Sequence, residues 1–318
     1  MLLDKNPNVR TVINKIDDVG TASEYRTFKY ELLAGDPDMN VELKEEDCIF
    51  RFDYSKVYWN SRLNTEHRRL IEMFKEGEAV CDVMAGVGPF AIPAGKKKVF
   101  VWANDLNPDS YASLKDGIHR NKVHMRNQDD EFRVSFTQLT LSQVSKFVRS
   151  FNEDGRTFIR SAAQQLLRTN VTVNVSPKPS RSSRQMANSS PTPSTSPPIH
   201  QPAKILREAR TFSHYVMNLP ASALSFLNAF IGLYRGHEDL FAPHTTSRLP
   251  MVHVHCFSTK SEDNVEEKRK ICKEISERIQ FEVKPDDPEV EIWDVRDVAP
   301  QKRMYCASFR LPSEVAFR

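Results

Sequence analysis

Short apolar runs alternate with amphipathic segments over most of this chain. Strands are predicted at 79–84, 99–104, 212–217, 250–257, 288–294 and 302–310, and helices at 64–75, 108–121, 140–150, 221–234 and 262–280. Alternating strands and helices are typical of a mainly parallel sheet with helices on both faces. The segment between the last two strands is too short for a parallel crossover, so these strands are expected to form an antiparallel hairpin at one edge.

The region before this alternating part has a different pattern. Segments 11–14, 27–33 and 48–54 alternate as strands do, and a Gly-Asp-Pro turn begins at Gly35. We therefore expect a small β-rich N-terminal region over residues 1–62. The main α/β domain is expected over residues 63–318, and its first helix is expected to be capped by Asn64 or Thr65.

Residues 175–202 interrupt the alternation. These 28 residues contain seven prolines and eight serines and no aromatic side chain. Such a composition cannot bury enough apolar surface to offset the entropy of ordering. The segment is predicted to be a disordered insertion within the sheet domain, because the sheet needs elements from both sides of it.

The composition of the chain excludes some classes of protein and leaves others open. The 318 residues are 39% hydrophobic and 27% charged, with a formal net charge of +3. The longest apolar runs are too short for a membrane span, and no signal peptide is visible at the start. Five cysteines without a C-x-x-C pair favour buried thiols over disulfides or a metal site. The mildly basic charge permits nucleic-acid binding without arguing for it.

The strongest chemical signal is a glycine turn between two apolar runs. Gly86 and Gly88 follow the run at 79–83, and Asp105 closes the next run 17 residues after Gly88. This is the pattern of a nucleoside-binding βαβ unit, in which the acid can hold two ribose hydroxyls. The turn lacks a third glycine, so it suits a ligand without a pyrophosphate, such as S-adenosylmethionine. A purely structural turn is the alternative.

Two further segments are expected at the same carboxyl edge of the sheet. Asn218, followed by Leu219 and Pro220, ends the predicted strand at 212–217 and offers both a donor and an acceptor to a planar base. Asp154 and Gly155 are expected where a neighbouring strand ends, at a position that commonly contacts an adenine. For each segment, a simple turn is the competing interpretation.

Several long motifs resemble one family. They are Phe28-Lys-Tyr-Glu-Leu-Leu-Ala-Gly-Asp, Lys56-Val-Tyr-Trp-Asn-Ser-Arg-Leu-Asn-Thr-Glu-His, Asp82-Val-Met-Ala-Gly-Val-Gly-Pro-Phe, Ala103-Asn-Asp-Leu-Asn-Pro, Met217-Asn-Leu-Pro-Ala-Ser-Ala and Val295-Arg-Asp-Val-Ala-Pro-Gln-Lys-Arg-Met-Tyr. With them the chain resembles the eukaryotic and archaeal tRNA (guanine-37, N1)-methyltransferases, in their fungal form. The resemblance implies a class I S-adenosylmethionine-dependent methyltransferase fold. It also implies methyl transfer to N1 of the guanosine 3′ to the anticodon.

The resemblance also implies roles for individual residues. N1 of guanine carries a proton at neutral pH, so the reaction needs a base near N1 and a cation or donor near O6. By matching motifs, Glu66 falls on the proposed base, Arg26 on the O6-stabilising arginine and Asn218 on the residue that reads guanine. Cofactor-contacting positions are His67, Asp105, Leu106, Asp154, Gly155 and Asn218, with Gly86 and Gly88 in the turn.

The chemistry requires that the carboxylate and the guanidinium are not committed to other partners. The competing interpretations are a helix-dipole acid for Glu66 and a salt bridge in the N-terminal sheet for Arg26. Another transferase on the same fold, which transfers an aminocarboxypropyl group, and a shortened non-catalytic RNA-binding paralogue are the alternative functions.

Family members resemble this chain only after an additional N-terminal domain that holds the tRNA body. We expect that this chain lacks that domain and that its tRNA affinity is reduced, because phosphate contacts supply much of the binding. The expected partner is tRNA with guanosine at position 37, bound by a monomer that is not attached to a membrane. Family resemblance implies a cytoplasmic location, with nuclear and mitochondrial pools.

Overall fold

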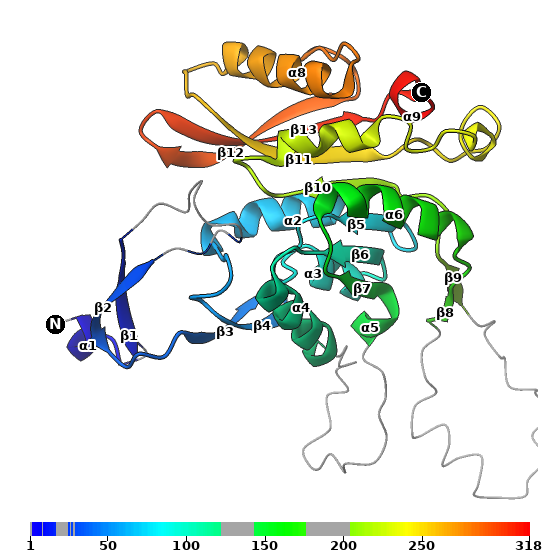
Figure 1. The fold of residues 1–318 in the computed structure, drawn as a ribbon. Coiled ribbons are helices and arrows are strands. Elements are labelled where there is room, and N and C mark those ends of the chain that lie inside the picture. Colours follow the sequence, from blue (N-terminus) through cyan, green and yellow to red (C-terminus); the bar gives the residue numbers. More distant parts are fainter. Residues whose placement is uncertain are drawn as a thin grey trace, which may run out of the picture.

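A seven-stranded sheet forms the centre of the computed structural model, which describes residues 2–7, 9–16, 25, 27, 29–121, 143–175 and 204–318. The strand order is β12-β13-β11-β10-β5-β6-β7 (Figure 1). The strands are β5 (Ala79–Asp82), β6 (Phe100–Asn104), β7 (Val148–Phe151), β10 (His214–Met217), β11 (Met251–Ser258), β12 (Val290–Ala299) and β13 (Lys302–Arg310). All neighbours are parallel except β13, which runs antiparallel to both β11 and β12. The predicted fold, a mainly parallel sheet with a C-terminal antiparallel hairpin, is confirmed.

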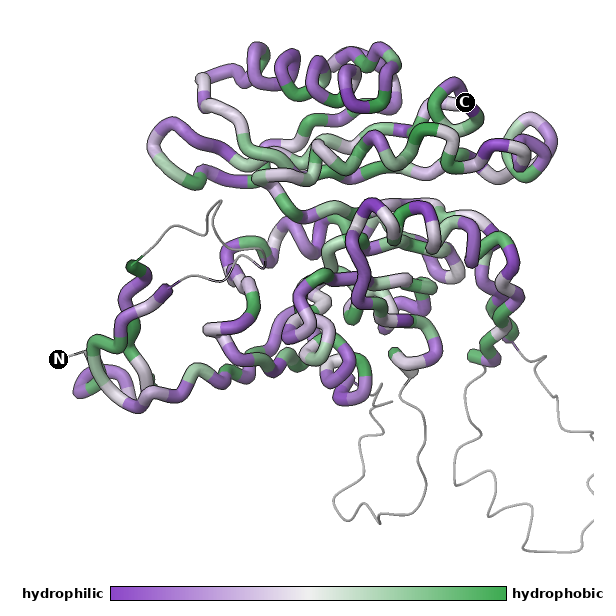
Figure 2. Tube along the Cα trace, in the orientation of Figure 1, coloured by the Kyte–Doolittle hydropathy of each residue, from purple (hydrophilic) through white to green (hydrophobic). Residues whose placement is uncertain are grey.

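Both faces of the sheet are buried, and residues alternate between them along each strand. In β5, Ala79 and Cys81 join one apolar cluster, whereas Val80 joins the other. One cluster packs under α6 (Gly155–Arg168), the 3₁₀ helix η2 (Ala223–Phe230) and α8 (Val265–Ile279). The other packs under α2 (Asn64–Met73), α3 (Ala91–Lys96) and α4 (Pro108–Arg120). The alternating colours of α6 and α8 in Figure 2 show the same amphipathic pattern on the helices.

Some predicted element boundaries were wrong. The helix expected at 140–150 is α5 (Gln143–Phe147), and the next four residues form strand β7. Val148 pairs with Val101 of β6 and packs against Gly95, where a Cβ would lie 2.4 Å from a Val148 methyl carbon. Helix α6 was not predicted, and the segment after Asn218 is 3₁₀ rather than α-helical. Tertiary pairing thus overrode the local pattern at β7.

The N-terminal region consists of two separate hairpins. Strand β1 (Thr11–Lys15) pairs with β2 (Tyr30–Gly35), and β3 (Asn40–Glu45) pairs with β4 (Cys48–Asp53), after the short helix α1 (Leu2–Lys5). The inward residues Cys48, Phe50 and Phe52 belong to the same apolar cluster as α2. The division of the chain after residue 62 stays a prediction.

Two smaller features complete the fold. Strands β8 (Thr172–Asn174) and β9 (Ile205–Arg207) pair antiparallel and flank the predicted insertion, of which residues 176–202 lie outside the described residues. The remaining short helices are η1 (Ser61–Leu63), η3 (Glu238–Leu240) and α9 (Ser313–Ala316). All five cysteines are buried free thiols. In the part of the chain that the structure describes, no helix has both the length and the apolarity to cross a membrane.

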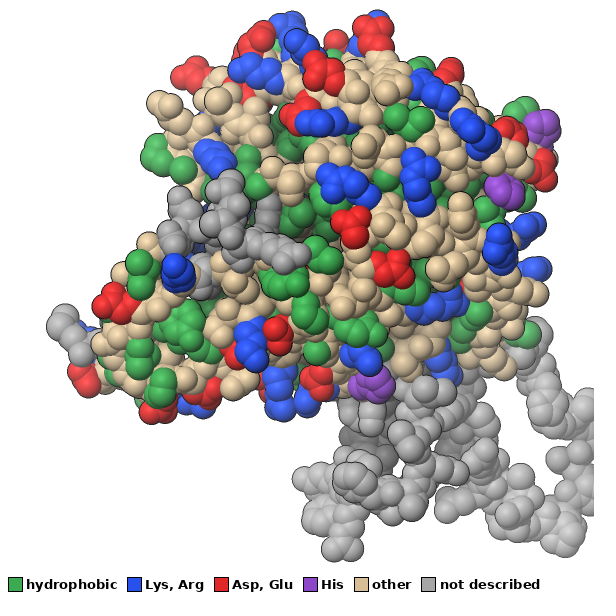
Figure 3. Space-filling view, in the orientation of Figure 1, with side chains coloured by type: hydrophobic (Ala, Val, Ile, Leu, Met, Phe, Trp, Pro, Cys, Tyr) green, Lys and Arg blue, Asp and Glu red, His purple; other side chains and the backbone are tan. Residues whose placement is uncertain are grey.

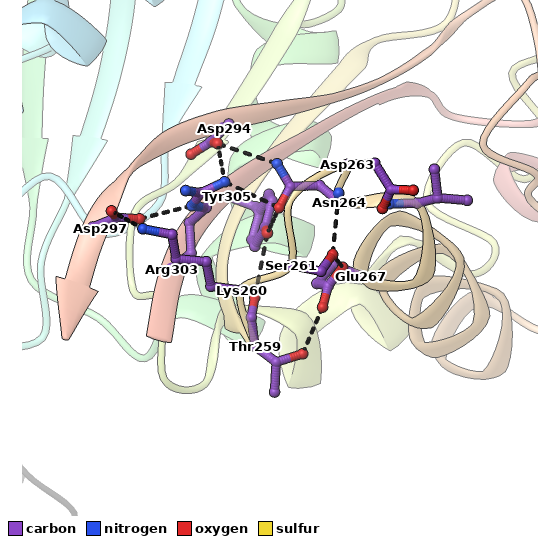
Figure 4. Close-up of polar contacts among 11 residues, drawn as sticks. Thr259, Lys260, Ser261, Asp263, Asn264, Glu267, Asp294, Asp297, Arg303 and Tyr305 are labelled. Atoms are coloured by element: carbon purple, nitrogen blue, oxygen red, sulfur yellow. Dashed lines mark hydrogen bonds and ion pairs between the residues drawn. The ribbon is translucent and has the colours of Figure 1, made fainter. Parts of the chain in front are cut away.

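A polar cluster fixes the C-terminal hairpin to the loop before α8 (Figure 4). Arg303 forms ion pairs with Asp294 at 2.6 Å and with Asp297 at 2.8 Å. The Tyr305 hydroxyl donates to the Asn264 side-chain oxygen at 2.8 Å. Because these residues come from β12, β13 and the loop, the cluster holds three segments in one arrangement.

Surface charge is mixed on the face of the molecule in Figure 3. Lys and Arg side chains alternate with Asp and Glu across this face and do not form one continuous basic area. Opposite charges pair at short range, for example Arg248 with Glu289 at 2.6 Å. Among the described residues on this face, basic side chains therefore stand close to acidic ones.

Candidate active site

A cleft lies at the carboxyl edge of the sheet, where ligands bind in open α/β folds. It has an empty volume of about 740 Å³ and collects residues from the ends of β5, β6 and β10 and from the start of α6. Its lining residues are Tyr25, Tyr58, Val83, Met84, Gly86, Asn104, Asp105, Leu106, Asn107, Ser110, Asp154, Gly155, Asn218, Leu219 and Phe226. Six of the residues predicted for the site are among them: Gly86, Asp105, Leu106, Asp154, Gly155 and Asn218.

The glycine turn and the acid after β6 are joined directly. The Gly86 amide donates to one Asp105 carboxylate oxygen at 2.7 Å, and the Asn107 amide donates to the other at 2.9 Å. Burial raises the pKa of Asp105, and the two amide hydrogen bonds oppose that rise. The backbone at Gly86 has a φ of +56°, which favours glycine. The carboxylate is thereby oriented with lone pairs left for a ligand's hydroxyl groups.

Gly88 has a structural role in the turn and does not line the cleft. Its φ is +95°, and a Cβ at this position would lie 2.6 Å from a Leu114 methyl carbon. The residue thus allows the turn to pack tightly against α4. The prediction placed it with the cofactor-binding turn, and the structure places it behind that turn.

Asp154 lines the cleft and also begins helix α6. Its carboxylate oxygen accepts hydrogen bonds from the amides of Arg156 at 2.9 Å and Thr157 at 3.1 Å, as an N-cap does. Gly155 follows, and a Cβ there would lie 3.1 Å from the Phe226 ring. The pair therefore shapes this wall of the cleft and lets an aromatic ring approach it.

Asn218 follows the last residue of β10 and is half-buried at the cleft. Its side-chain amide makes no hydrogen bond to any residue that the structure describes. Among the described residues, neither its donor nor its acceptor has a partner, which fits the predicted role of reading a base edge. Leu106, 43% exposed, adds an apolar surface on the side of the cleft formed after β6.

Glu66 lies outside the cleft lining and is buried in α2 with both carboxylate oxygens engaged. Arg69 donates to them at 2.7 and 2.9 Å, and His255 Nε2 lies 2.8 Å from Oε1. Burial favours a higher pKa, but the hydrogen bonds from Arg69 and His255 outweigh burial and lower the pKa of Glu66 to about 2. The expectation of an uncommitted carboxylate was wrong. The role of Glu66 as base stays a prediction.

His67 is also buried away from the cleft lining. Its Nδ1 lies 2.6 Å from a Glu45 carboxylate oxygen, and its ring meets the Phe90 ring edge-on at 4.8 Å. His67 thus ties α2 to strand β3. Its predicted contact with a cofactor stays a prediction. Arg26 lies outside the described residues, whereas its neighbour Tyr25 lines the cleft.

Asn104, a residue that the sequence analysis did not single out, organises the cleft floor. Its fully buried side chain donates to the carbonyls of Val83 at 3.1 Å and Glu153 at 3.0 Å and accepts from the Glu153 amide at 2.8 Å. These bonds join the ends of β5, β6 and β7. The signal was available in the sequence, because Asn104 stands directly before Asp105 at the end of a buried run.

Asp82 is a second residue that sequence reasoning did not assign. It is the last residue of β5, fully buried, and neither carboxylate oxygen has a hydrogen-bond partner among the described residues. Burial is the main cause that raises the pKa of Asp82 to about 8, and the nearby Asp105 carboxyl adds to the rise. Asp82 is not among the residues that line the cleft, so it is a buried carboxyl held protonated beside the cleft.

Comparisons with known proteins agree with this geometry. The sequence model of the TRM5/TYW2 methyltransferase domain matches residues 41–172. The chain is 53% identical to a tRNA (guanine(37)-N(1))-methyltransferase from Emericella nidulans and 45% identical to one from Schizosaccharomyces pombe. Each alignment covers 100% of this chain and 63% of the relative, so the chain spans less than two thirds of these curated relatives.

Solved structures share the fold. Trm5b from Pyrococcus abyssi matches with a TM-score of 0.55 at 21% identity, over 97% of this chain and 66% of that one. An aTrm5 in complex with tRNALeu matches with a TM-score of 0.56 at 18% identity, over 98% of this chain and 64% of that one. Sequence identity to the fungal relatives and the matched domain model point the same way: the chain carries a methyltransferase domain of the TRM5/TYW2 family.

Proposed function

We propose that this chain transfers a methyl group from S-adenosylmethionine to N1 of guanosine 37 in tRNA. The observation that carries the proposal is the cleft itself, which is lined both by an acid held by a glycine turn and by Asn218, whose amide has no partner among the described residues. The relatives named above, whose printed names describe this activity, support it.

The residues of the cleft fit S-adenosylmethionine. Asp105 is oriented to accept hydrogen bonds from two ribose hydroxyls, and Leu106 and Phe226 offer apolar surface for an adenine. The absence of a third glycine fits a ligand without a pyrophosphate. When bound, S-adenosylmethionine supplies an electrophilic methyl group.

The protein's part in the reaction is to orient the guanine and take its N1 proton. Asn218 is placed to hold the base edge, because its amide has no other described partner. Glu66 is the proposed base, and its carboxylate is kept ionised by Arg69 and His255. Arg26 is the proposed donor to O6. Removal of the N1 proton frees the lone pair that accepts the methyl group.

The test is methyl transfer to a tRNA transcript with G at position 37, beside a transcript with A at that position. S-adenosylmethionine labelled in the methyl group should give labelled 1-methylguanosine only from the first transcript. In a parallel reaction, S-adenosylmethionine is labelled in its carboxyl carbon. Transfer of that label to the tRNA would indicate aminocarboxypropyl transfer, the alternative reaction. Cofactor binding without either product would contradict the proposal and favour an RNA-binding role.

Assembly and location belong to the same proposal. We expect a monomer in solution, which light scattering measures directly. A cytoplasmic location with nuclear and mitochondrial pools rests on the family resemblance. Fluorescent tagging of the full-length protein in a fungal cell would test it, and confinement to one compartment would contradict it.

A further inference from the structure

A row of polar side chains lies on a buried face of the sheet, under helix α2. Their positions alternate along β10, β11 and β13, so all of them point to the same face. The row consists of His214, His253, His255, Cys306 and Ser308. His214 Nδ1 lies 3.0 Å from His253 Nε2, and His253 Nδ1 lies 2.8 Å from the Ser308 hydroxyl. A buried face of a parallel sheet is normally apolar, because burial of polar side chains costs free energy. A row of polar side chains on such a face therefore suggests a functional role.

Within this row, His255 makes the contact to Glu66. Its Nε2 lies 2.8 Å from Glu66 Oε1, and both side chains are buried. Its other nitrogen lies 3.4 Å from the Met217 carbonyl, directly before Asn218. His255 thus connects the carboxylate in α2 to the strand end that carries the cleft residue Asn218.

We infer that His255 is a positioning residue for the methyl transfer, which holds the Glu66 carboxylate in place and ionised. The inference rests on the proposed function, in which Glu66 is the base. Arg69 fixes the same carboxylate from within α2, three residues away. His255 adds the contact from the sheet, so the carboxylate is held relative to the cleft as well as to its own helix.

The charges around the pair explain why His255 matters. Glu66 faces it from α2, Cys306 from β13 and His253 from its own strand, and Asp82 acts on it from β5. Arg69, also in α2, acts on Glu66 and on His253. Burial opposes a charged imidazole, but Cys306 and Glu66 outweigh burial and raise the pKa of His255 to about 10. With the Glu66 carboxylate 2.8 Å away, His255 Nε2 is placed to donate to Glu66 Oε1. Without His255, Arg69 alone would oppose the rise that burial causes in the pKa of Glu66.

The same residues could be considered as a metal site, because ligand atoms of Glu66, His255 and Cys306 lie within 4.8 Å of one another. The Arg69 guanidinium already donates to both Glu66 oxygens. Its positive charge next to these ligands disfavours a bound cation. The arrangement therefore fits a proton-holding role better than a metal-holding one.

The test compares methyl transfer by His255→Gln and His255→Leu between pH 6 and pH 8.5. The Gln variant retains a neutral donor, and the Leu variant removes the donor and the charge. His253→Gln, two residues away in the same buried row, is the matched control. Thermal unfolding and S-adenosylmethionine binding by calorimetry establish that each variant is folded.

For His255→Leu, the ratio of the variant's kcat to that of wild type should be lower at pH 6 than at pH 8.5, because loss of the donor raises the pKa of Glu66. For His255→Gln, the same kcat ratio should fall toward pH 6 by a smaller factor. For His253→Gln, the kcat ratio to wild type should stay constant between pH 6 and pH 8.5. A purely structural role would lower kcat equally at all pH values. If wild type is active and both His255 variants keep the wild-type decline of kcat toward acidic pH, this inference is overturned and the proposed function is not. Absence of 1-methylguanosine from the wild type would overturn the proposed function and this inference with it.

Discussion

Replacement of Asp82 by Asn tests whether a carboxyl is held protonated beside the cleft. The side chain is fully buried without a described hydrogen-bond partner, and its pKa is raised from 3.8 to about 8. In the unfolded chain the same group loses its proton near pH 4. Between these two values the native state holds one more proton than the unfolded state. The free energy of unfolding therefore falls as pH rises through this window.

The size of the effect follows from this proton difference. One bound proton changes the free energy of unfolding by about 1.4 kcal/mol per pH unit, so Asp82 costs wild type about 3 kcal/mol between pH 5 and pH 7. Asp82→Asn mimics the protonated acid and removes this dependence. The variant should therefore gain stability relative to wild type as pH rises.

Urea unfolding of both proteins at pH 5, 6 and 7 measures the difference directly. Asp109→Asn, in the exposed first turn of α4, is the control for the loss of one aspartate. Its stability relative to wild type should change little with pH. If the free energy of unfolding depends on pH in the same way for wild type and Asp82→Asn, the reasoning is refuted. Asp82 would then be ionised in the native state.

Three further outcomes are expected. Gly88→Ala should destabilise the protein by about 2–4 kcal/mol, because φ is +95° and the new Cβ would lie 2.6 Å from a leucine methyl carbon. In contrast, Gly86→Ala, with φ +56° and open space, should cost about 1 kcal/mol, and thermal unfolding compares the two. Asp105→Ala should weaken S-adenosylmethionine binding at least tenfold in calorimetry, because a pair of ribose hydroxyls loses its acceptor; unchanged affinity would place the ribose elsewhere. Tyr305→Phe should lower the free energy of urea unfolding by about 1 kcal/mol through loss of its 2.8 Å hydrogen bond, and no loss would mean that the bond contributes nothing net.

Much of the sheet could be predicted from the sequence because its signals are local. Apolar runs bounded by turn residues located β5, β6, β10, β11, β12 and β13 to within a few residues. The short link before β13 was enough to predict an antiparallel hairpin. A strand was expected to end before Asp154, but the residues of β7 were assigned to a helix, because β7 is four residues long and follows directly on helix α5. At that length, pairing with β6 decides the conformation and the local pattern does not.

The cleft was predictable to the extent that its residues follow strand ends. Asp105 and Asn218 each follow a strand directly, and parallel strands bring their carboxyl ends to one edge. The position of Gly86 could be predicted because a turn residue with positive φ favours glycine. Gly88 was grouped with the cleft because the sequence does not tell which side of the turn a glycine faces.

By itself, therefore, the sequence determined the α/β class, the strand order at the hairpin edge, the glycine turn and the residues at the ends of two strands. Only the tertiary structure decided that Glu66 meets Arg69 and His255, that His67 meets Glu45, and that Asp82 is left without a partner. Glu66 and His255 are 189 residues apart. The physical reason is that such contacts depend on how α2 packs on the sheet and on the register between β11 and β13, and neither quantity is encoded in the residues near Glu66.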